Sequence, residues 1–251
     1  MCIVFLAIRK HPDYPLIIAA NRDEYHNRPS AGMDFWADHP HVLSGRDLEE
    51  GGAWLGVTRS GCFCTVTNLT AGAKAREDSL SRGQLVRRFL VDEPPGEEFG
   101  RYLSARDWRY RPFNLIFGHG TDLYTYSNRE RRLRPLEAGY HSISNGPMDH
   151  SWPKMSHGVK KLTALIDRGA ELDTDSLTRL MQDRNPPAVD PDGNGGSAFS
   201  PIFIRGDAYG TRATTCLLFG QSEIRVTESC YDPSGEIVAR HDFTIGTGHA
   251  D

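Results

Sequence analysis

Two apolar runs near the start of the chain decide its fold class: CIVFLAI at residues 2–8 and LIIAA at residues 16–20. A short turn segment with two prolines, residues 11–15, separates them. Two runs of this length joined by a turn are typical of a β-hairpin, and their unbroken apolar character indicates that both strands are buried. The sequence therefore predicts a buried hairpin with Cys2 on a central strand.

The rest of the chain continues in blocks of strands and helices. Further strand patterns occupy residues 53–57, 62–68, 113–118, 123–127 and 141–144, and then 202–204, 213–219, 224–227 and 237–243. A cap at Ser79 or Ser81 begins a predicted helix with Leu85, Val86, Phe89 and Leu90 on one stripe. Further helices are expected at 96–106, 153–167 and 174–183, and residues 185–200 form a loop rich in Gly and Pro. Hairpin spacing favours antiparallel sheets with helices on their outer faces. We expect an α/β fold of the α+β kind, a four-layer α/β/β/α sandwich, formed by a single domain over residues 1–251.

Composition excludes several classes of protein. The 251 residues are 38% hydrophobic and 25% charged, which is typical of a globular chain of one core. The net charge of −4 gives no basic surface for a phosphate backbone, so no nucleic-acid partner is expected. No apolar run reaches the roughly 18 residues of a membrane span. The positive charges at Arg9 and Lys10 follow the first apolar run, unlike those of a signal peptide, so we expect a cytoplasmic protein.

The five cysteines do not form a recognisable framework. An odd number in a cytoplasmic chain argues against disulfides. Cys62 and Cys64 lack a second pair at zinc-finger spacing, and on a strand they share one face, so they are interpreted as buried core residues. The sequence predicts no metal and no cofactor.

Cys2 has a chemistry that the other cysteines lack. Removal of Met1, which is favoured when residue 2 is small, leaves a thiol and an α-amine on one residue. That amine has a pKa of about 7.7–8.0 and the free thiol one of about 8.5. The amine can therefore take the thiol proton and generate a nucleophile for an acyl carbon. The alternative is a core cysteine in an apolar strand.

Four polar residues, Asn21-Arg22-Asp23-Glu24, follow the second apolar run. They would serve as a solvated turn. In the functional interpretation, the hairpin returns Asp23 to the start of the first strand, where its carboxylate orients the new amine and stabilises its protonated form.

Three later residues are also candidates. Asn68 ends a strand, where its amide could donate to an oxyanion, although a turn asparagine is the simpler explanation. Asn145 lies in a Ser-Asn-Gly-Pro run that is first of all turn chemistry. Arg212 precedes an apolar strand and is either a surface charge or a fixed cation that faces a carboxylate.

Together these residues resemble the NRDE family, also called the transport-and-Golgi-organisation type 2 family. The resemblance extends over nearly the whole chain, and it is carried by Met1-Cys2-Ile3, Ala20–Glu24, Gly52–Gly56, Thr67-Asn68, Ser81–Gly83, Ser144–Pro147 and Tyr209–Arg212. That family is in turn similar to the N-terminal-nucleophile (Ntn) hydrolases, in the branch of choloylglycine hydrolases and penicillin V acylases.

The resemblance implies a set of site residues. Cys2 would be the nucleophile and Asp23 would orient the amine. Asn68 and Asn145 would hold the oxyanion, and Arg212 would match a late active-site arginine. The acylases place an arginine directly before their Asn-x-Asp, where this chain has Ala20. Asn21 and Arg22 are expected to contact substrate, although Arg22 on a strand points to the face opposite Asn21.

Two functions follow from the resemblance. In the first, the protein is a cysteine amidohydrolase that acts on an acyl amide bond other than an α-peptide bond, through Cys2 after Met1 removal. In the second, the pocket only binds, and the protein carries haem or an acyl or lipid ligand. A catalytic amine requires the loss of Met1 and a carrier does not. The sequence gives neither the substrate nor the oligomeric state.

Overall fold

The structure is a computed structural model that describes residues 2–69, 79–148, 150–169, 171–185 and 201–247. These residues divide into two compact units whose segments alternate along the chain. Residues 1–28, 138–144 and 149–245 belong to unit 1, and residues 29–137, 145–148 and 246–251 belong to unit 2. The expectation of a single domain stays a prediction.

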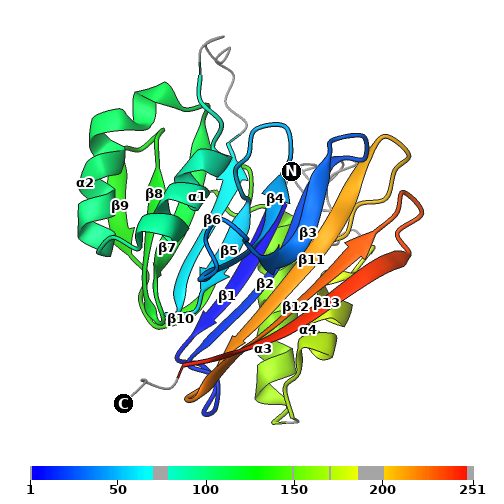
Figure 1. Cartoon of the computed structure of the whole chain (residues 1–251). Coiled ribbons are helices and arrows are strands. Elements are labelled where there is room, and N and C mark those ends of the chain that lie inside the picture. Colours follow the sequence, from blue (N-terminus) through cyan, green and yellow to red (C-terminus); the bar gives the residue numbers. More distant parts are fainter. Residues whose placement is uncertain (1, 70–78, 149, 170, 186–200, 248–251) are drawn as a thin grey trace. The chain divides into compact units, whose positions relative to one another are not determined.

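Unit 1 is built on a six-stranded sheet with the order β10-β1-β2-β11-β12-β13 (Figure 1). Its strands are β1 (Cys2–Ile8), β2 (Leu16–Tyr25), β10 (Gly139–Ile143), β11 (Tyr209–Phe219), β12 (Glu223–Tyr231) and β13 (Ile237–Gly246). The pairs β1–β2, β1–β10, β2–β11 and β11–β12 are antiparallel. The hairpin of β1 and β2 thus lies inside the sheet, which explains why both strands are apolar at successive positions.

Two helices, α3 (Pro153–Asp167) and α4 (Thr174–Met181), pack against this sheet. Their apolar stripes share a core with alternate residues of the central strands. Phe5 is one of these strand residues, and Gly158 of α3 lies directly against its ring. Side chains of β1 and β2 that point the other way, such as Val4 and Ile18, are also buried.

Unit 2 contains a seven-stranded sheet with the order β3-β4-β5-β6-β7-β8-β9. Its elements are β3 (Ser30–Phe35), β4 (Val42–Asp47), β5 (Leu55–Thr58), β6 (Cys62–Asn68), α1 (Gly83–Asp92), α2 (Gly96–Arg106), the 3-10 turn η1 (Asp107–Arg109), β7 (Phe113–His119), β8 (Asp122–Ser127) and β9 (Arg132–Pro135). All of its strand pairs are antiparallel, and α1 and α2 pack against the sheet. Cys62 and Cys64 are buried in its core, as expected.

The structure corrects several of the sequence-based elements. The second strand does not end at Ala20 but continues to Tyr25, because β11 pairs with its whole length. Strands β3, β4 and β9 were not expected. Residues 202–204 are buried but do not form a strand, since the backbone of Ile204 bonds to Thr211 instead. Neither serine caps α1, whose N-cap is Arg82. The predicted loop 185–200 lies almost wholly outside the described residues.

None of the helices in the described part of the chain combines the length and apolarity that a bilayer crossing requires.

Candidate functional site

Cys2 is the first described residue of β1 and is half-buried. In the register of β1 and β2 it lies directly opposite Arg22. Its carbonyl oxygen accepts a hydrogen bond from the Ser144 hydroxyl at 2.8 Å, just after the end of β10. The backbone of Cys2 is therefore held by β2 on one side and by the segment that follows β10 on the other.

Asp23 is buried on β2, with 2% of its surface exposed. The Thr211 hydroxyl donates to its Oδ1 at 2.7 Å, and the Tyr209 hydroxyl donates to its backbone oxygen at 3.1 Å. Burial raises the pKa of the Asp23 carboxyl to about 6, against the opposing effects of the chain's N-terminal amine (that of Met1, before its removal), Lys154 and the Thr211 hydrogen bond. At neutral pH the carboxylate is therefore charged, and it can bind a cation more strongly than an exposed carboxylate can.

Lys154 supplies a buried positive charge in the same unit. It is only 1% exposed, although lysine is almost never fully buried without a counter-charge. Burial lowers the pKa of its ammonium, while the charges of Asp23 and Cys2 raise it. It occupies the first turn of α3, where the helix dipole disfavours a cation. The Asp23 carboxylate, rather than the helix, therefore stabilises this charge.

Sequence analysis missed Lys154, although a signal was present. The buried residues of α3 are Lys154, Met155, Gly158, Leu162 and Ile166. Lys154 precedes Gly158 and Leu162 by four and eight positions, which places it on the buried stripe of the helix. A lysine at a core position of an amphipathic helix indicates a buried partner of opposite charge.

Arg22 shares the face of the sheet on which Cys2 lies, because directly opposed residues of antiparallel strands point the same way. It is 6% exposed. Burial raises the pKa of the Cys2 thiol, and the charge of Asp23 raises it further. The N-terminal amine, a hydrogen bond from the Asp23 backbone and the charge of Arg22 all lower it. The thiol is therefore protonated at rest, and cations beside it favour its ionisation.

Asn21 points to the opposite face of β2 and joins three segments of unit 1. Its Nδ2 donates to the carbonyls of Met181 and Ile202, both at 2.9 Å. Its Oδ1 accepts a hydrogen bond from the Thr214 hydroxyl at 2.7 Å. These bonds position the strand that carries Arg22 and Asp23, and a direct role for Asn21 in substrate binding stays a prediction.

Arg212 lies at a β-bulge between Thr211 and Ala213 of β11. Its guanidinium donates to the carbonyl oxygens of Tyr25, the last residue of β2, and of Arg28, in the turn that follows. Thr211, not Arg212, contacts the Asp23 carboxylate. Arg212 therefore fixes the end of the strand that carries Asp23, and its predicted catalytic role is untested.

Asn68 and Asn145 come together within unit 2. The Asn145 Nδ2 donates to the backbone oxygen of Asn68 at 2.6 Å, and Asn145 is almost fully buried. The next residue, Gly146, accepts a hydrogen bond from the Asn114 amide at 2.8 Å. These contacts hold the segment after β10 beside the end of β6. Whether Asn68 and Asn145 meet the residues around Cys2 stays a prediction.

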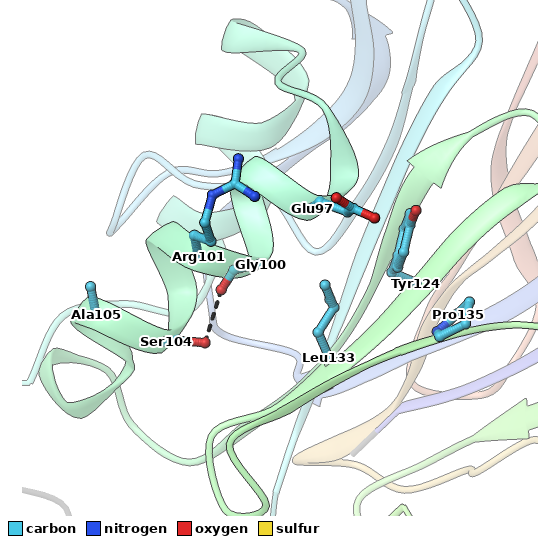
Figure 2. Close-up of a pocket in the computed structure, with 8 residues that line it drawn as sticks. All are labelled: Glu97, Gly100, Arg101, Ser104, Ala105, Tyr124, Leu133 and Pro135. Carbon is cyan, nitrogen blue, oxygen red and sulfur yellow. Dashed lines mark hydrogen bonds between the residues drawn. The ribbon is translucent and has the colours of Figure 1, made fainter.

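An open groove in unit 2 does not have the features of a catalytic site. It lies between α2 and the strands β8 and β9 (Figure 2). Its lining residues are Glu97, Gly100, Arg101, Ser104, Ala105, Tyr124, Leu133 and Pro135. Figure 2 shows Glu97 and Arg101 pointing in different directions, and the Ser104 hydroxyl is bonded to the Gly100 carbonyl at 3.0 Å.

Sequence comparison assigns the family. The model of the family described as "Transport and Golgi organisation 2" matches residues 1–233. The chain belongs to this family. A Bos taurus protein named Transport and Golgi organization protein 2 homolog is 31% identical over 275 residues, which cover 98% of this chain and 99% of the relative. The Homo sapiens protein of the same name is 32% identical over 244 residues and covers 87% and 88% of the two chains. The NRDE resemblance is confirmed.

Solved structures confirm the fold class. Penicillin V acylase from Agrobacterium tumefaciens superposes with a TM-score of 0.55 at 11% identity, over 98% of this chain and 86% of that chain. The C2A mutant of the conjugated bile acid hydrolase from Clostridium perfringens gives a TM-score of 0.56 at 10% identity, over 97% and 92%. This member of the Transport and Golgi organisation 2 family thus has an α+β, Ntn-hydrolase-like fold with antiparallel sheets. Identities this low show the fold alone.

Proposed function

We propose that this protein is a cysteine amidohydrolase of the Ntn type, which cleaves an acyl amide bond other than an α-peptide bond. Cys2 is the nucleophile once Met1 has been removed. One observation carries the proposal: Cys2 shares its unit with the buried charges of Asp23, Lys154 and Arg22, and each of these charges acts on the Cys2 thiol. A cysteine that only filled a core would need none of them, because buried charges are costly.

Activation of Cys2 begins with its own amine. The amine accepts the thiol proton, directly or through a water molecule, and becomes an ammonium group. Asp23 stabilises this ammonium, and the positive charges of Arg22 and Lys154 stabilise the thiolate. A thiol whose pKa is raised by burial needs this help, since only the thiolate attacks a carbonyl carbon.

Acylation and deacylation then follow with protons in balance. The thiolate forms a C–S bond with the acyl carbon, and the carbonyl electron pair moves to the oxygen. The tetrahedral intermediate collapses, the C–N bond breaks, and the leaving amine takes the proton from the N-terminal ammonium. A water molecule attacks the resulting thioester, and the free N-terminal amine accepts its proton. The C–S bond then breaks, the carboxylic acid leaves, and the N-terminal ammonium returns the proton to the thiolate.

We propose that Asn68 donates to the oxyanion and that Asn145 positions it. The hydrogen bond from the Asn145 amide to the Asn68 backbone supports this assignment. Ser144, which holds the Cys2 carbonyl, directly precedes Asn145 in the sequence. Donation of this kind is worth about 2.7–4 kcal/mol of transition-state stabilisation in other enzymes.

A carrier is the second candidate function, and the names of the relatives favour it. The bovine and human relatives are named for transport and Golgi organisation. In this alternative the protein binds haem or an acyl or lipid ligand without turnover, and Cys2 need not be the first residue.

We also propose that the protein works in the cytoplasm. The chain has five cysteines, and an odd number of thiols suits a reducing compartment.

Two forms of the protein, identical from Cys2 onward, test the proposed activity. One carries a cleavable leader ahead of Cys2, and in the other the leader has been removed so that Cys2 is the first residue. Each is incubated with a panel of acyl amides, quenched in acid and weighed by intact-mass spectrometry. We expect an acyl adduct on the form with the free amine alone.

Two variants locate that adduct. Cys2→Ala should abolish it, and Cys62→Ala, which removes a buried thiol of unit 2, should retain it. Equal acylation of both forms would show that the amine is not the base. An acyl ligand or haem that binds the free-amine form without turnover would instead support the carrier.

A further inference from the structure

A second group of reactive side chains lies on β12 and β13 of unit 1. Glu228 and Cys230 are two positions apart on β12, so they point to the same face. His241 belongs to β13, the next strand in the sheet. One oxygen of Glu228, the Cys230 sulfur and one ring nitrogen of His241 all lie within 4.8 Å of one another. Glu228 is 0% exposed, and the other two residues are half-buried.

The spacing of these atoms matches the geometry of a tetrahedral metal. The Cys230 Sγ lies 3.5 Å from the Glu228 Oε2. Two ligands of one tetrahedral zinc ion, with bonds of about 2.3 Å to sulfur and about 2.0 Å to oxygen, lie about 3.5 Å apart. The thiol and the carboxylate therefore already have the separation of two ligands of one ion.

We propose that Glu228, Cys230 and His241 bind a zinc ion, with water in the fourth position. Thiolate and imidazole ligands select zinc over calcium or magnesium, which prefer oxygen. Binding displaces to solvent the thiol proton that Cys230 now donates to Glu228. The thiolate and the carboxylate then balance the two charges of the ion. Burial and the Glu228 carboxylate raise the pKa of the Cys230 thiol to about 12, and the charges of Arg212 and Arg22 act against this rise. The ion must therefore displace a firmly held proton, and the two arginines also weaken the attraction for a cation.

The zinc site is separate from the Cys2 site. Cys2, Arg22, Ala213 and Cys230 lie opposite one another on β1, β2, β11 and β12. Three strand spacings, or about 14 Å, therefore separate the Cys2 and Cys230 backbones. An ion at Cys230 is therefore too far from Cys2 to be bound by the Cys2 thiol. It ties the edge strand β13 to β12, and β13 has mostly exposed or half-exposed side chains.

Zinc binding to the full chain tests this proposal. Protein freed of metal with a chelator is titrated with Zn²⁺ against a chromophoric competitor, and with Co²⁺, whose absorption bands report tetrahedral geometry and a thiolate ligand. The amine and thiol of Cys2 are a rival chelate, so the titrations are made in a Cys2→Ala background. We expect one ion per chain, a thiolate-to-cobalt charge-transfer band, and a higher Tm with zinc.

Further variants locate the ion. Cys230→Ala and His241→Ala in that background should each weaken zinc binding by at least tenfold and abolish the Tm shift. His150→Ala, which removes an exposed histidine of the same unit, should change neither. Circular dichroism before metal addition confirms that each variant is folded. Absence of binding in the Cys2→Ala protein, or binding that survives both Cys230→Ala and His241→Ala, would overturn the proposal.

Discussion

Asp23 and Lys154 are buried residues of opposite charge that both act on Cys2. Neither favours the stability of its own element: a buried carboxylate is costly, and a cation in the first turn of a helix opposes the helix dipole. Side chains that lower local stability in this way cluster at functional sites, where the rest of the fold compensates for them. Their effects can be measured one residue at a time.

Replacement of Asp23 should change how stability depends on pH. The folded pKa of about 6 lies above the ordinary value of 3.8, so the folded state binds this proton more tightly than the unfolded state does. The contribution of Asp23 to stability is therefore complete below pH 3.8 and is lost as the pH rises through 6. It amounts to about 3 kcal/mol at most. Asp23→Asn removes this loss, and Asn can still accept the Thr211 hydrogen bond.

Urea unfolding at pH 4 and pH 7.5 measures this effect. The stability of Asp23→Asn minus that of the native protein should be larger at pH 7.5 than at pH 4. The variant should no longer form the acyl-enzyme. Asp13→Asn controls for the loss of one exposed carboxylate. A stability difference that is the same at both pH values would contradict the raised pKa.

Replacement of Lys154 should slow the reaction of Cys2 with alkylating reagents. Lys154→Met keeps the length of the side chain and removes its charge. The Cys2 thiol should then ionise at higher pH, and the alkylation rate at pH 7.5 should fall roughly three- to tenfold. Rates measured from pH 6 to 10 report the apparent thiol pKa, which a merely structural role would not shift. Lys160→Met, an exposed position on the same helix, is the matched control. Coinciding pH profiles for the two variants would disprove the electrostatic role.

Among the elements, α3 determines where Lys154 lies, and one glycine determines how closely α3 approaches β1. A Cβ atom at Gly158 would lie 2.0 Å from the Phe5 Cζ, so no larger residue fits without a shift of the helix. The sequence shows only a glycine inside a helical pattern, which by itself indicates a weak helix.

Gly158→Ala should destabilise the protein despite its higher helix propensity. Alanine favours a helix by about 1 kcal/mol, whereas overpacking of a core costs about 1–3 kcal/mol. We expect a net loss of stability and slower alkylation of Cys2, because Lys154 would move with the helix.

Phe5→Leu tests the cause of this loss. It removes the ring that the new methyl group would meet, so Gly158→Ala should cost less in the Phe5→Leu background. Urea unfolding of the four proteins gives the coupling energy. Additive effects would show that the contact with Phe5 is not the cause.

At the scale of the whole molecule, the residues of the proposed reaction come from different units. Cys2 and Asp23 belong to unit 1, and Asn68 belongs to unit 2. Replacement of Asn68 therefore tests whether a residue of unit 2 takes part in the reaction.

Asn68→Ala should lower the rate of acylation without lowering the reactivity of the thiol. An oxyanion donor acts on the tetrahedral intermediate, so its loss should slow acylation by about 10²- to 10³-fold. Alkylation by a small haloacetamide forms no oxyanion, and its rate should not change. Asn27→Ala, at an exposed position, is the control. A parallel fall in both rates would indicate that Asn68 acts through the fold, and unchanged acylation would remove Asn68 from the site.

The sequence by itself determined the antiparallel sheets, the helix at 153–167 and the family. These follow from local patterns: continuous apolar runs for central strands, a 3.6-residue stripe for the helix, and short motifs around Cys2 and Asp23. It also indicated that Cys62 and Cys64 share a buried face, since side chains on a strand alternate.

Only the tertiary structure decided the length of β2, the strand character of β3 and the burial of Lys154. Asn21–Tyr25 looks like a polar turn, but it remains in the sheet because β11, about 190 positions later, pairs with it. Ser30–Phe35 has little apolar character, and its pairing with β4 makes it a strand. Glu228 and His241 likewise meet across two strands. In each case the residue that makes the stabilising contact is distant in sequence, so a local sequence pattern does not reveal it.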